Sequence, residues 1–321
     1  MSDAAPTAVL APDDWSVQRP RAVRAWRGFA RFCRTKKVGA FGLALTLAMF
    51  VMAVIGPWVV PYDKDQTFDR PNPNYDLNSF DKDALSPTIL SRLDTPSWDH
   101  LLGTDDKGRD MLTRIILGAR LSLEVGIAAS ALATLIGAAL GIISGYIGGL
   151  VDLLIQRVVD AMIAIPGTLF LLLLLQTAQP SKSVTIGALT VLGIFGTSRL
   201  MRSAVLSIRN EVYIQAARAV GAPALRIMLR HVLPNVMAPL LVVFTIQIGG
   251  NILAESGLAF LGLGVPGPSW GQMVATSRTF VDSKPLMSVF AGGAITLTVL
   301  GLNLLGDALR DVFDPRQRGR G

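Results

Sequence analysis

Long apolar runs separated by polar or charged segments dominate the pattern of the 321-residue chain. The hydrocarbon core of a bilayer is about 30 Å thick and is crossed by a helix of about 20 apolar residues. Runs close to or above this length lie at residues 38–60, 122–146, 150–175, 184–200, 236–263 and 286–305. The pattern therefore predicts an all-α fold, a polytopic membrane bundle of six transmembrane helices.

The charges change sign from one predicted side of the membrane to the other. Residues 1–37 contain eight basic and three acidic side chains, whereas residues 61–110 contain six basic and eleven acidic ones. Residues 199–235 contain six arginines against one acid, Glu211. Because basic residues accumulate on the cytoplasmic side, we expect a multi-pass protein of the plasma (inner) membrane with both termini in the cytoplasm. The same distribution explains the net charge of +7 without a nucleic-acid partner.

The spans and loops divide the chain into five predicted parts. These are a basic cytoplasmic arm (1–37), the first transmembrane helix (38–60), an extracytoplasmic segment (61–114), a transmembrane core (115–306) with a cytoplasmic loop (203–235), and a cytoplasmic tail (307–321). We expect the first span to be retained, because its apolar run is longer than that of a signal peptide and ends at Pro61 rather than at a small-residue cleavage site.

The composition agrees with a membrane protein and leaves little to build an enzyme from. Apolar residues make up 51% of the chain and charged residues 17%, against about a quarter charged in soluble domains. Cys33 is the single cysteine, and His100 and His231 fall on opposite predicted sides of the membrane, which argues against a metal cluster or an intramembrane active site. The chain also lacks a phosphate-binding loop, so we expect it to bind no cofactor itself.

The cytoplasmic loop carries the most specific signals. Asn210 is the expected N-cap of a first short helix, Gly221 its left-handed C-terminal cap, and Pro223 the start of a second helix that Pro234 separates from the next span. The expected apolar stripes are Tyr213, Ala216, Ala217 and Val220 on the first helix, and Leu225, Met228, Leu229 and Val232 on the second. Such a loop could receive another protein or could lie on lipid headgroups, and the residue chemistry leaves both open.

This loop resembles the EAA loop of permease subunits in ATP-binding-cassette importers, whose pattern is E-A-A-x-x-x-G. Residues 215–221 match it in order and spacing, with Gln215 in place of the usual glutamate, a change that keeps hydrogen bonding but removes an ion pair. The resemblance implies that the loop docks in a groove of an ATPase subunit and transmits its closure to the spans. The residues expected to carry this coupling are Tyr213, Gln215, Ala216, Ala217, Gly221, Ala222 and Arg226.

Three further segments resemble the dipeptide, oligopeptide and nickel branch of these importers, namely residues 100–123, 255–273 and 302–316. The long segment after the first span is similar to that of the second, or C-type, permease of such systems. The resemblance implies a homologous permease partner, two ATPase chains that bind ATP and Mg, an extracytoplasmic substrate-binding protein and a peptide substrate. The alternative is a secondary transporter driven by an ion gradient, which would be expected to show internal repeats and mid-membrane carboxylates.

Polar residues within the spans are candidates for function, because they are costly at membrane depth. Gln247, Asn251 and Glu255 recur every four residues, so they share one helix face. They could line a translocation path, with a hydrogen-bonded seam against a sister permease as the other interpretation.

Three other groups have a structural interpretation that we favour. His100, Thr104, Asp105, Arg109 and Asp110 could contact a binding protein, but Gly-Thr-Asp is ordinary turn chemistry. Ala129, Ala133, Gly137, Gly141 and Gly145 form a small-residue ridge of the kind that packs helices in lipid. Arg157 and Asp160 are spaced to pair on one helix face.

Overall fold

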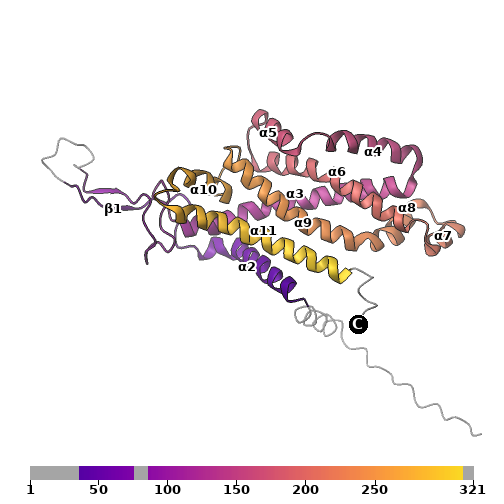
Figure 1. Cartoon of the computed structure of the whole chain (residues 1–321), viewed down its shortest axis with the longest axis horizontal. Coiled ribbons are helices and arrows are strands. Elements are labelled where there is room, and N and C mark those ends of the chain that lie inside the picture. Colours follow the sequence, from indigo (N-terminus) through magenta and orange to yellow (C-terminus); the bar gives the residue numbers. More distant parts are fainter. Residues whose placement is uncertain (1–35, 76–85, 314–321) are drawn as a thin grey trace, which may run out of the picture.

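The computed structural model describes residues 36–75 and 86–313, which form an elongated helix bundle (Figure 1). The long helices are α2 (Lys37–Val59), α3 (Met111–Ile147), α6 (Lys182–Ile208), α9 (Leu233–Phe260) and α11 (Pro285–Phe313). The shorter elements are β1 (Asp69–Pro71), β2 (Thr88–Leu90), α4 (Gly149–Ile163), α5 (Gly167–Thr177), α7 (Val212–Ala219), α8 (Ala224–Ile227), a π-helical turn (Met228–Val232), α10 (Trp270–Ser277) and a 3₁₀ turn (Arg278–Phe280). Most of the predicted cytoplasmic arm and the end of the tail lie outside the described residues.

Within the described residues, five helices are long and apolar enough to cross a membrane, and the pair α4–α5 raises the number to six if it counts as one span. This agrees with the six predicted spans in order and place. Several helices extend beyond the apolar runs: α3 already begins at Met111, where the side chain of Asp110 accepts a hydrogen bond from Thr113 N at 2.8 Å and caps the helix.

The third span is not the single straight helix that we expected at residues 150–175. It is broken between Ile163 and Gly167, and α4 and α5 meet at an angle of 79°. Pro166 stands at the break as the N-cap of α5. Because proline lacks an N–H and its ring clashes with the preceding turn, the helix cannot continue through this position.

The small-residue ridge of α3 packs against α6 of the same chain. Ala129 and Ala133 are fully buried. A Cβ atom added to Gly141 would lie 2.5 Å from the carbonyl oxygen of Ser198, and one added to Gly137 would lie 2.6 Å from that of Ile194. The favoured interpretation of the ridge as helix packing is therefore confirmed, because only glycine lets the two backbones approach so closely.

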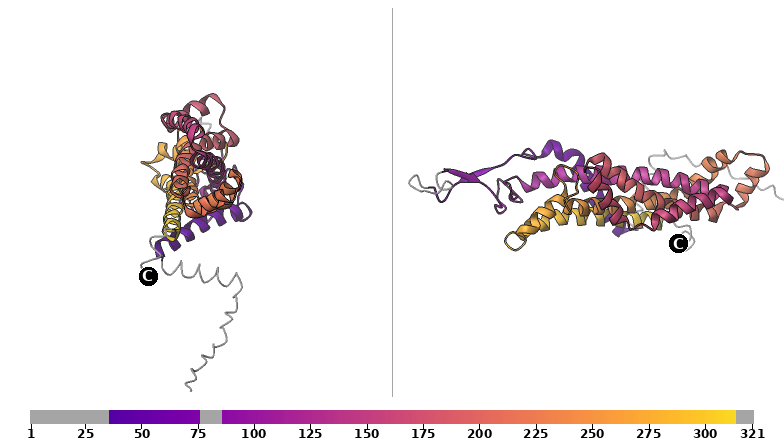
Figure 2. Two further views of the ribbon diagram at one scale, coloured as in Figure 1. Left: turned by 90° about the vertical axis from the view of Figure 1, so that its right-hand side faces the viewer. Right: turned by 90° about the horizontal axis from the view of Figure 1, so that it is seen from above.

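The bundle has two distinct ends, which Figure 2 shows in a view from above. At one end, here called the hairpin end, the antiparallel pair β1–β2 projects away from the helices. Helix α10 lies near this end and is held to α3 by Trp270, which is fully buried and donates from Nε1 to the carbonyl oxygen of Ile115 at 2.9 Å. At the other end, here called the loop end, α7 projects.

Candidate coupling site

Helix α7 is the outermost element of the loop end, between α6 and α8 (Figure 1). It begins after Glu211, so Asn210 is not the N-cap that we expected, and no side chain caps the helix. The carbonyl oxygen of Asn210 instead accepts a hydrogen bond from the side-chain amide of Gln215 at 2.8 Å. The capping prediction was wrong because the preceding turn places Glu211, rather than Asn210, in the extended conformation before the helix.

The predicted C-terminal cap is confirmed. Gly221 has a φ of +76°, a left-handed conformation that glycine adopts without steric penalty. The Gly221 N–H donates to the carbonyl oxygen of Arg218 at 2.9 Å, and the Ala222 N–H donates to that of Ala217 at 3.1 Å. These bonds reverse the chain direction after α7 and direct Pro223 toward the next helix.

The second helix of the loop is continuous with the fifth span, whereas the sequence predicts two separate helices. Residues Ala224–Phe260 form one helical path in which residues Met228–Val232 make a π-helical turn. The wider turn accommodates Pro234, which would clash with the carbonyl of an ordinary α-helical turn. The side-chain amide of Asn235 donates to the carbonyl oxygen of His231 at 2.6 Å, so one carbonyl of this turn gains a substitute partner.

One side of α7 is anchored in the bundle. Ile214 is fully buried and belongs to a cluster with Val205 of α6, Ile142 of α3 and Ile227 of α8. Arg218 adds a polar contact: its Nε lies 3.2 Å from the hydroxyl of Tyr146, and its guanidinium carbon lies 4.9 Å from the centre of that ring. A displacement of α7 must therefore act directly on the ends of α3 and α6.

The other side of the loop presents apolar side chains that nothing in the described chain covers. Val212 is 80% exposed and Val220 84% exposed, with Tyr213, Leu225 and Leu229 also exposed. Partial burial and the nearby Glu211 raise the pKa of the Tyr213 hydroxyl, so this group remains a neutral hydrogen-bond donor at physiological pH. Exposed apolar patches of this kind mark interaction sites.

The two predicted stripes of the loop lie partly on its exposed surface. Tyr213, Ala216 and Val220 are exposed, and Ala217 is the member of that stripe that touches the core. In the second stripe Met228 and Val232 are buried, whereas Leu225 and Leu229 are exposed. Ile214, the anchor, belongs to neither predicted stripe, although an apolar side chain next to Gln215 and the small Ala216 is a signal for a buried position.

The remaining predicted coupling residues lie on or beside the same exposed surface. Gln215, Ala216 and Arg226 are exposed, and Ala222 is half-buried. Their coupling role remains a prediction. The side-chain amide of Gln215 donates to the Asn210 carbonyl oxygen, a hydrogen bond within the loop that a glutamate carboxylate could not donate.

The polar residues of α9 face α3 of the same chain. Gln247 accepts a hydrogen bond from Thr134 at 3.0 Å, the side-chain amide of Asn251 donates to Ser130 at 2.9 Å, and Ser122 donates to the Glu255 carboxylate at 3.3 Å. Asn251 and Glu255 are buried, Glu255 completely. These contacts form a hydrogen-bonded seam between α9 and α3 of this chain, in which Gln247 is only partly buried. A role for these residues in the translocation path thus remains only a prediction.

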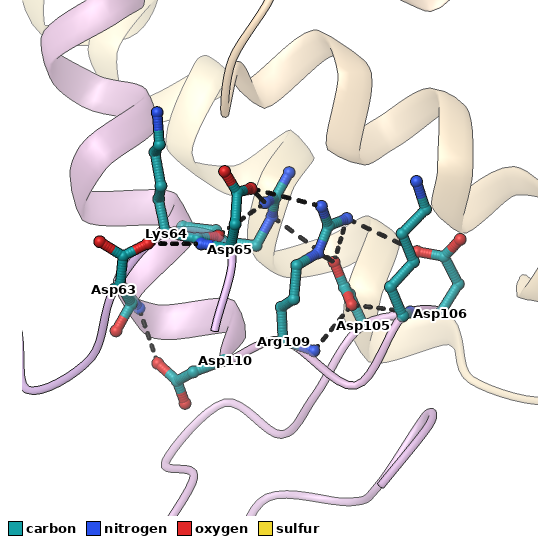
Figure 3. A network of polar contacts seen from close by, with 10 residues as sticks. Asp63, Lys64, Asp65, Asp105, Asp106, Arg109 and Asp110 are labelled. Atoms are coloured by element: carbon teal, nitrogen blue, oxygen red, sulfur yellow. Dashed lines mark hydrogen bonds and ion pairs between the residues drawn. The ribbon is translucent and has the colours of Figure 1, made fainter. Parts of the chain in front are cut away.

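The predicted outer contact forms a buried turn instead of an open surface (Figure 3). Asp105 is 4% exposed, accepts from the backbone N–H groups of Lys107 and Arg109 at 2.8 and 2.9 Å, and pairs with the Arg109 side chain at 2.6 Å. Thr104 is also buried and donates to the carbonyl oxygen of Ser91. The ring of His100 lies 3.0 Å from Asp110. This geometry agrees with the favoured structural interpretation.

The ion pairs of α4 connect it to α6 and do not link two residues on one face of α4. Asp160 pairs with Arg199 of α6, so the expected pair with Arg157 is wrong. Asp152 of α4 accepts from both Nε and Nη2 of Arg202 at 2.6 Å. The side chains find partners on α6 because α4 packs alongside it. Among the described residues, no three metal-ligating side chains lie close enough to hold a metal ion.

Comparison with known proteins identifies the family to which this helix bundle belongs. Residues 111–319 match the family described as the binding-protein-dependent transport system inner membrane component, and this match covers more than half of the chain. The chain therefore belongs to this family of membrane transport permeases. Residues 23–79 match the N-terminal transmembrane domain of oligopeptide transport permease C, which places the chain among the C-type permeases.

Individual relatives support this assignment, and their similarity to the chain extends over nearly their full lengths. The chain is 38% identical to the dipeptide transport system permease protein DppC of Alkalihalophilus pseudofirmus, over 92% of each chain. It is 37% identical to a putative peptide transport system permease protein of Brucella suis, over 91% of this chain and 92% of the relative. It is 34% identical to the glutathione transport system permease protein GsiD of Escherichia coli, over 94% of each. The chain is a transport permease rather than an enzyme, and the alternative of a secondary transporter is set aside.

Proposed function

We propose that the chain is one of two homologous permease subunits of a peptide importer and that α7 receives an ATPase subunit. The proposed cargo is a di- or oligopeptide, because two of the relatives that the chain resembles are named as dipeptide and putative peptide transport permeases. The two permeases together form the translocation pathway. Closure of the ATPase subunits moves α7, and α7 moves the helices to which it is anchored.

The observation that carries the proposal is the two-sided character of the loop end. Ile214 fixes α7 to the bundle, while Val212 and Val220 on its exposed surface have no cover within the described chain. A helix that is buried on one side and apolar on the other is suited to lie in the groove of a partner. A loop that lay only on lipid headgroups would need no such rigid connection to three spans.

The remaining partners follow from what the chain lacks and from its charge. Because the sequence has no phosphate-binding loop, two ATPase chains bind the ATP and Mg, and this chain binds no cofactor. The basic loop end and both termini lie in the cytoplasm, as the positive-inside rule predicts. The hairpin end then faces an extracytoplasmic substrate-binding protein.

The substitution Val220→Asp tests the docking surface. Val220 is 84% exposed, so the folded bundle should tolerate the change, whereas a carboxylate buried in the groove of a partner would be unpaired. We expect co-purification of the ATPase subunits and peptide uptake to fall by about tenfold or more, the effect of losing one interface hot spot.

Val220→Leu is the matched control, because it keeps an apolar side chain at the same exposed position, and it should leave both measurements near the wild-type values. Membrane level and thermal unfolding of the chain should be the same in both variants. Normal ATPase co-purification and normal uptake in Val220→Asp would contradict the proposal. Reduced membrane contact with unchanged ATPase binding would favour a loop that lies on headgroups.

A further inference from the structure

Three charged side chains gather at the hairpin end, on helices that lie in the membrane. Arg120 and Glu124 are one turn apart on α3, and Arg120 Nε donates to the Glu124 carboxylate at 3.0 Å. Lys182, the first residue of α6, contacts the other carboxylate oxygen. Together the three carry a net charge of +1.

A cavity of about 560 Å³ opens beside these charges, between α2, α3 and α6. Its apolar lining includes Phe50 and Val54 of α2, Ile127 of α3 and Ile186 of α6. Phe50 and Val54 are each 48% exposed, so the described chain leaves this side of the cavity uncovered. The cavity is apolar along its length and charged at one rim. This arrangement suits an amphiphilic ligand, which has an apolar tail and a charged headgroup.

The charged rim lies at the level of the membrane interface. Trp58 lines the same cavity, is 80% exposed and stands at the hairpin end of α2; tryptophan is enriched at the headgroup level. Helix α3 has 37 residues, a length of about 55 Å that exceeds the hydrocarbon core of about 30 Å. The apolar run of this helix begins at Ser122, so its first turns extend past the lipid and Arg120 lies near the interface.

We propose that this cavity binds an anionic phospholipid. The lipid phosphate lies between Arg120 and Lys182, and an acyl chain lies against Phe50 and Ile186. The two terminal nitrogens of Arg120 make no hydrogen bond to any described residue, so they are available to phosphate oxygens, which guanidinium binds in bidentate fashion.

The net charge selects among lipids. A phosphodiester headgroup with one negative charge neutralises the +1 of the three side chains, whereas a zwitterionic headgroup leaves it unbalanced. Glu124 holds the two cations together and at the same time competes with the phosphate for them. The proposal therefore predicts that removal of either cation weakens lipid binding and that removal of the Glu124 carboxylate strengthens it.

The test measures lipid binding to the full-length chain, purified in detergent with the subunits that accompany it. Native mass spectrometry should show preferential retention of phosphatidylglycerol over phosphatidylcholine. Arg120→Gln and Lys182→Gln should each weaken phosphatidylglycerol binding about fivefold, the value of one cation near an anionic lipid. Glu124→Gln should strengthen it, because the net charge rises to +2. A merely structural ion-pair network would not produce changes of opposite sign.

Arg278→Gln is the control, since Arg278 lies outside the cavity with its guanidinium carbon 5.7 Å from the Phe260 ring, and it should not change lipid retention. Equal retention of phosphatidylglycerol by the wild type and an Arg120→Gln/Lys182→Gln variant would overturn the proposal. So would a cross-link from Val54→Cys, in a Cys33→Ser background, to another protein chain in most molecules, because a helix would then fill the cavity. Neither result bears on ATPase docking by α7.

Discussion

Asp105 shows how a single side chain can organise a segment that has little regular structure. Its carboxylate accepts backbone hydrogen bonds from Lys107 and Arg109 and pairs with the Arg109 side chain. Arg114 of α3 approaches the same carboxylate, with Nε 3.5 Å from Oδ2, and Figure 3 shows Asp65 and Asp106 on the other sides of Arg109. Asp105 thus ties the outer segment to the start of the second span.

Asp105→Ala should lower the free energy of unfolding by about 3 kcal/mol, because the buried Arg114 would lose its buried carboxylate partner and keep only the exposed Asp65, 3.7 Å from its Nη1. The Arg114 side chain is 6% exposed, so water cannot replace the lost carboxylate. Thermal or denaturant unfolding of the purified chain is the measurement. Asp99→Ala, at an exposed position of the same segment, should stay within about 0.5 kcal/mol, and equal losses in both variants would argue against the network.

At the scale of the elements, close approach and local breaks decide how the helices pack. The α3–α6 contact depends on glycines that leave no room for a Cβ atom. The break at Pro166 turns one predicted span into two short helices, and the π-helical turn joins two predicted helices into one. In each case a local steric requirement changes the course of a helix whose apolar length was predicted correctly.

Two glycine substitutions should have opposite effects on stability. In Gly141→Ala the new Cβ would lie 2.5 Å from the Ser198 carbonyl oxygen and 2.7 Å from Met201 Cβ, so overpacking should destabilise the bundle by about 1–3 kcal/mol. Gly196→Ala on α6 meets nothing within 4 Å and should stabilise the helix by about 0.5–1 kcal/mol. Thermal unfolding in detergent measures both. A loss of stability in Gly196→Ala as large as in Gly141→Ala would show that helix packing is not the cause.

At the scale of the whole molecule, the two ends of the bundle carry different structural features. The hairpin end carries the outer segment and the charged cavity, whereas the loop end carries the anchored and exposed α7 (Figures 1 and 2). The long helices α3, α6 and α9 connect the two ends. Motion of α7 can therefore reach the hairpin end through rigid elements, with Ile214 as the point of entry.

The proposed orientation predicts which positions are reached from outside the cell. In a Cys33→Ser background, Trp98→Cys at a 96% exposed position of the outer segment should react with a membrane-impermeant maleimide in intact cells. Val220→Cys should react only after the cells are permeabilised and stripped of peripheral proteins. Labelling of Val220→Cys in intact cells would contradict a cytoplasmic loop end, and with it the docking of an ATPase.

The sequence by itself determined the class of the protein, the order of its spans and the position of the loop that contains α7. These properties depend on residues close together in the chain: apolar length for the spans, and the capping conformation of Gly221 for the loop. The partners of polar side chains could not be predicted in this way. Asn251 faces Ser130, and Asp152 faces Arg202, because α9 and α6 pack beside α3 and α4.

Only the tertiary structure decided which side of α7 is anchored and which is exposed. The periodicity of a short helix identifies its faces but not the neighbour each face meets, and Ile214 meets a cluster assembled from α3, α6 and α8. The same reason explains why the hydrogen bonds from the polar residues of α9 to α3 could not be predicted from the sequence. The pattern of residues along one helix shows which side chains share a face. Whether that face is buried depends on other helices, which are distant in sequence and adjacent in space.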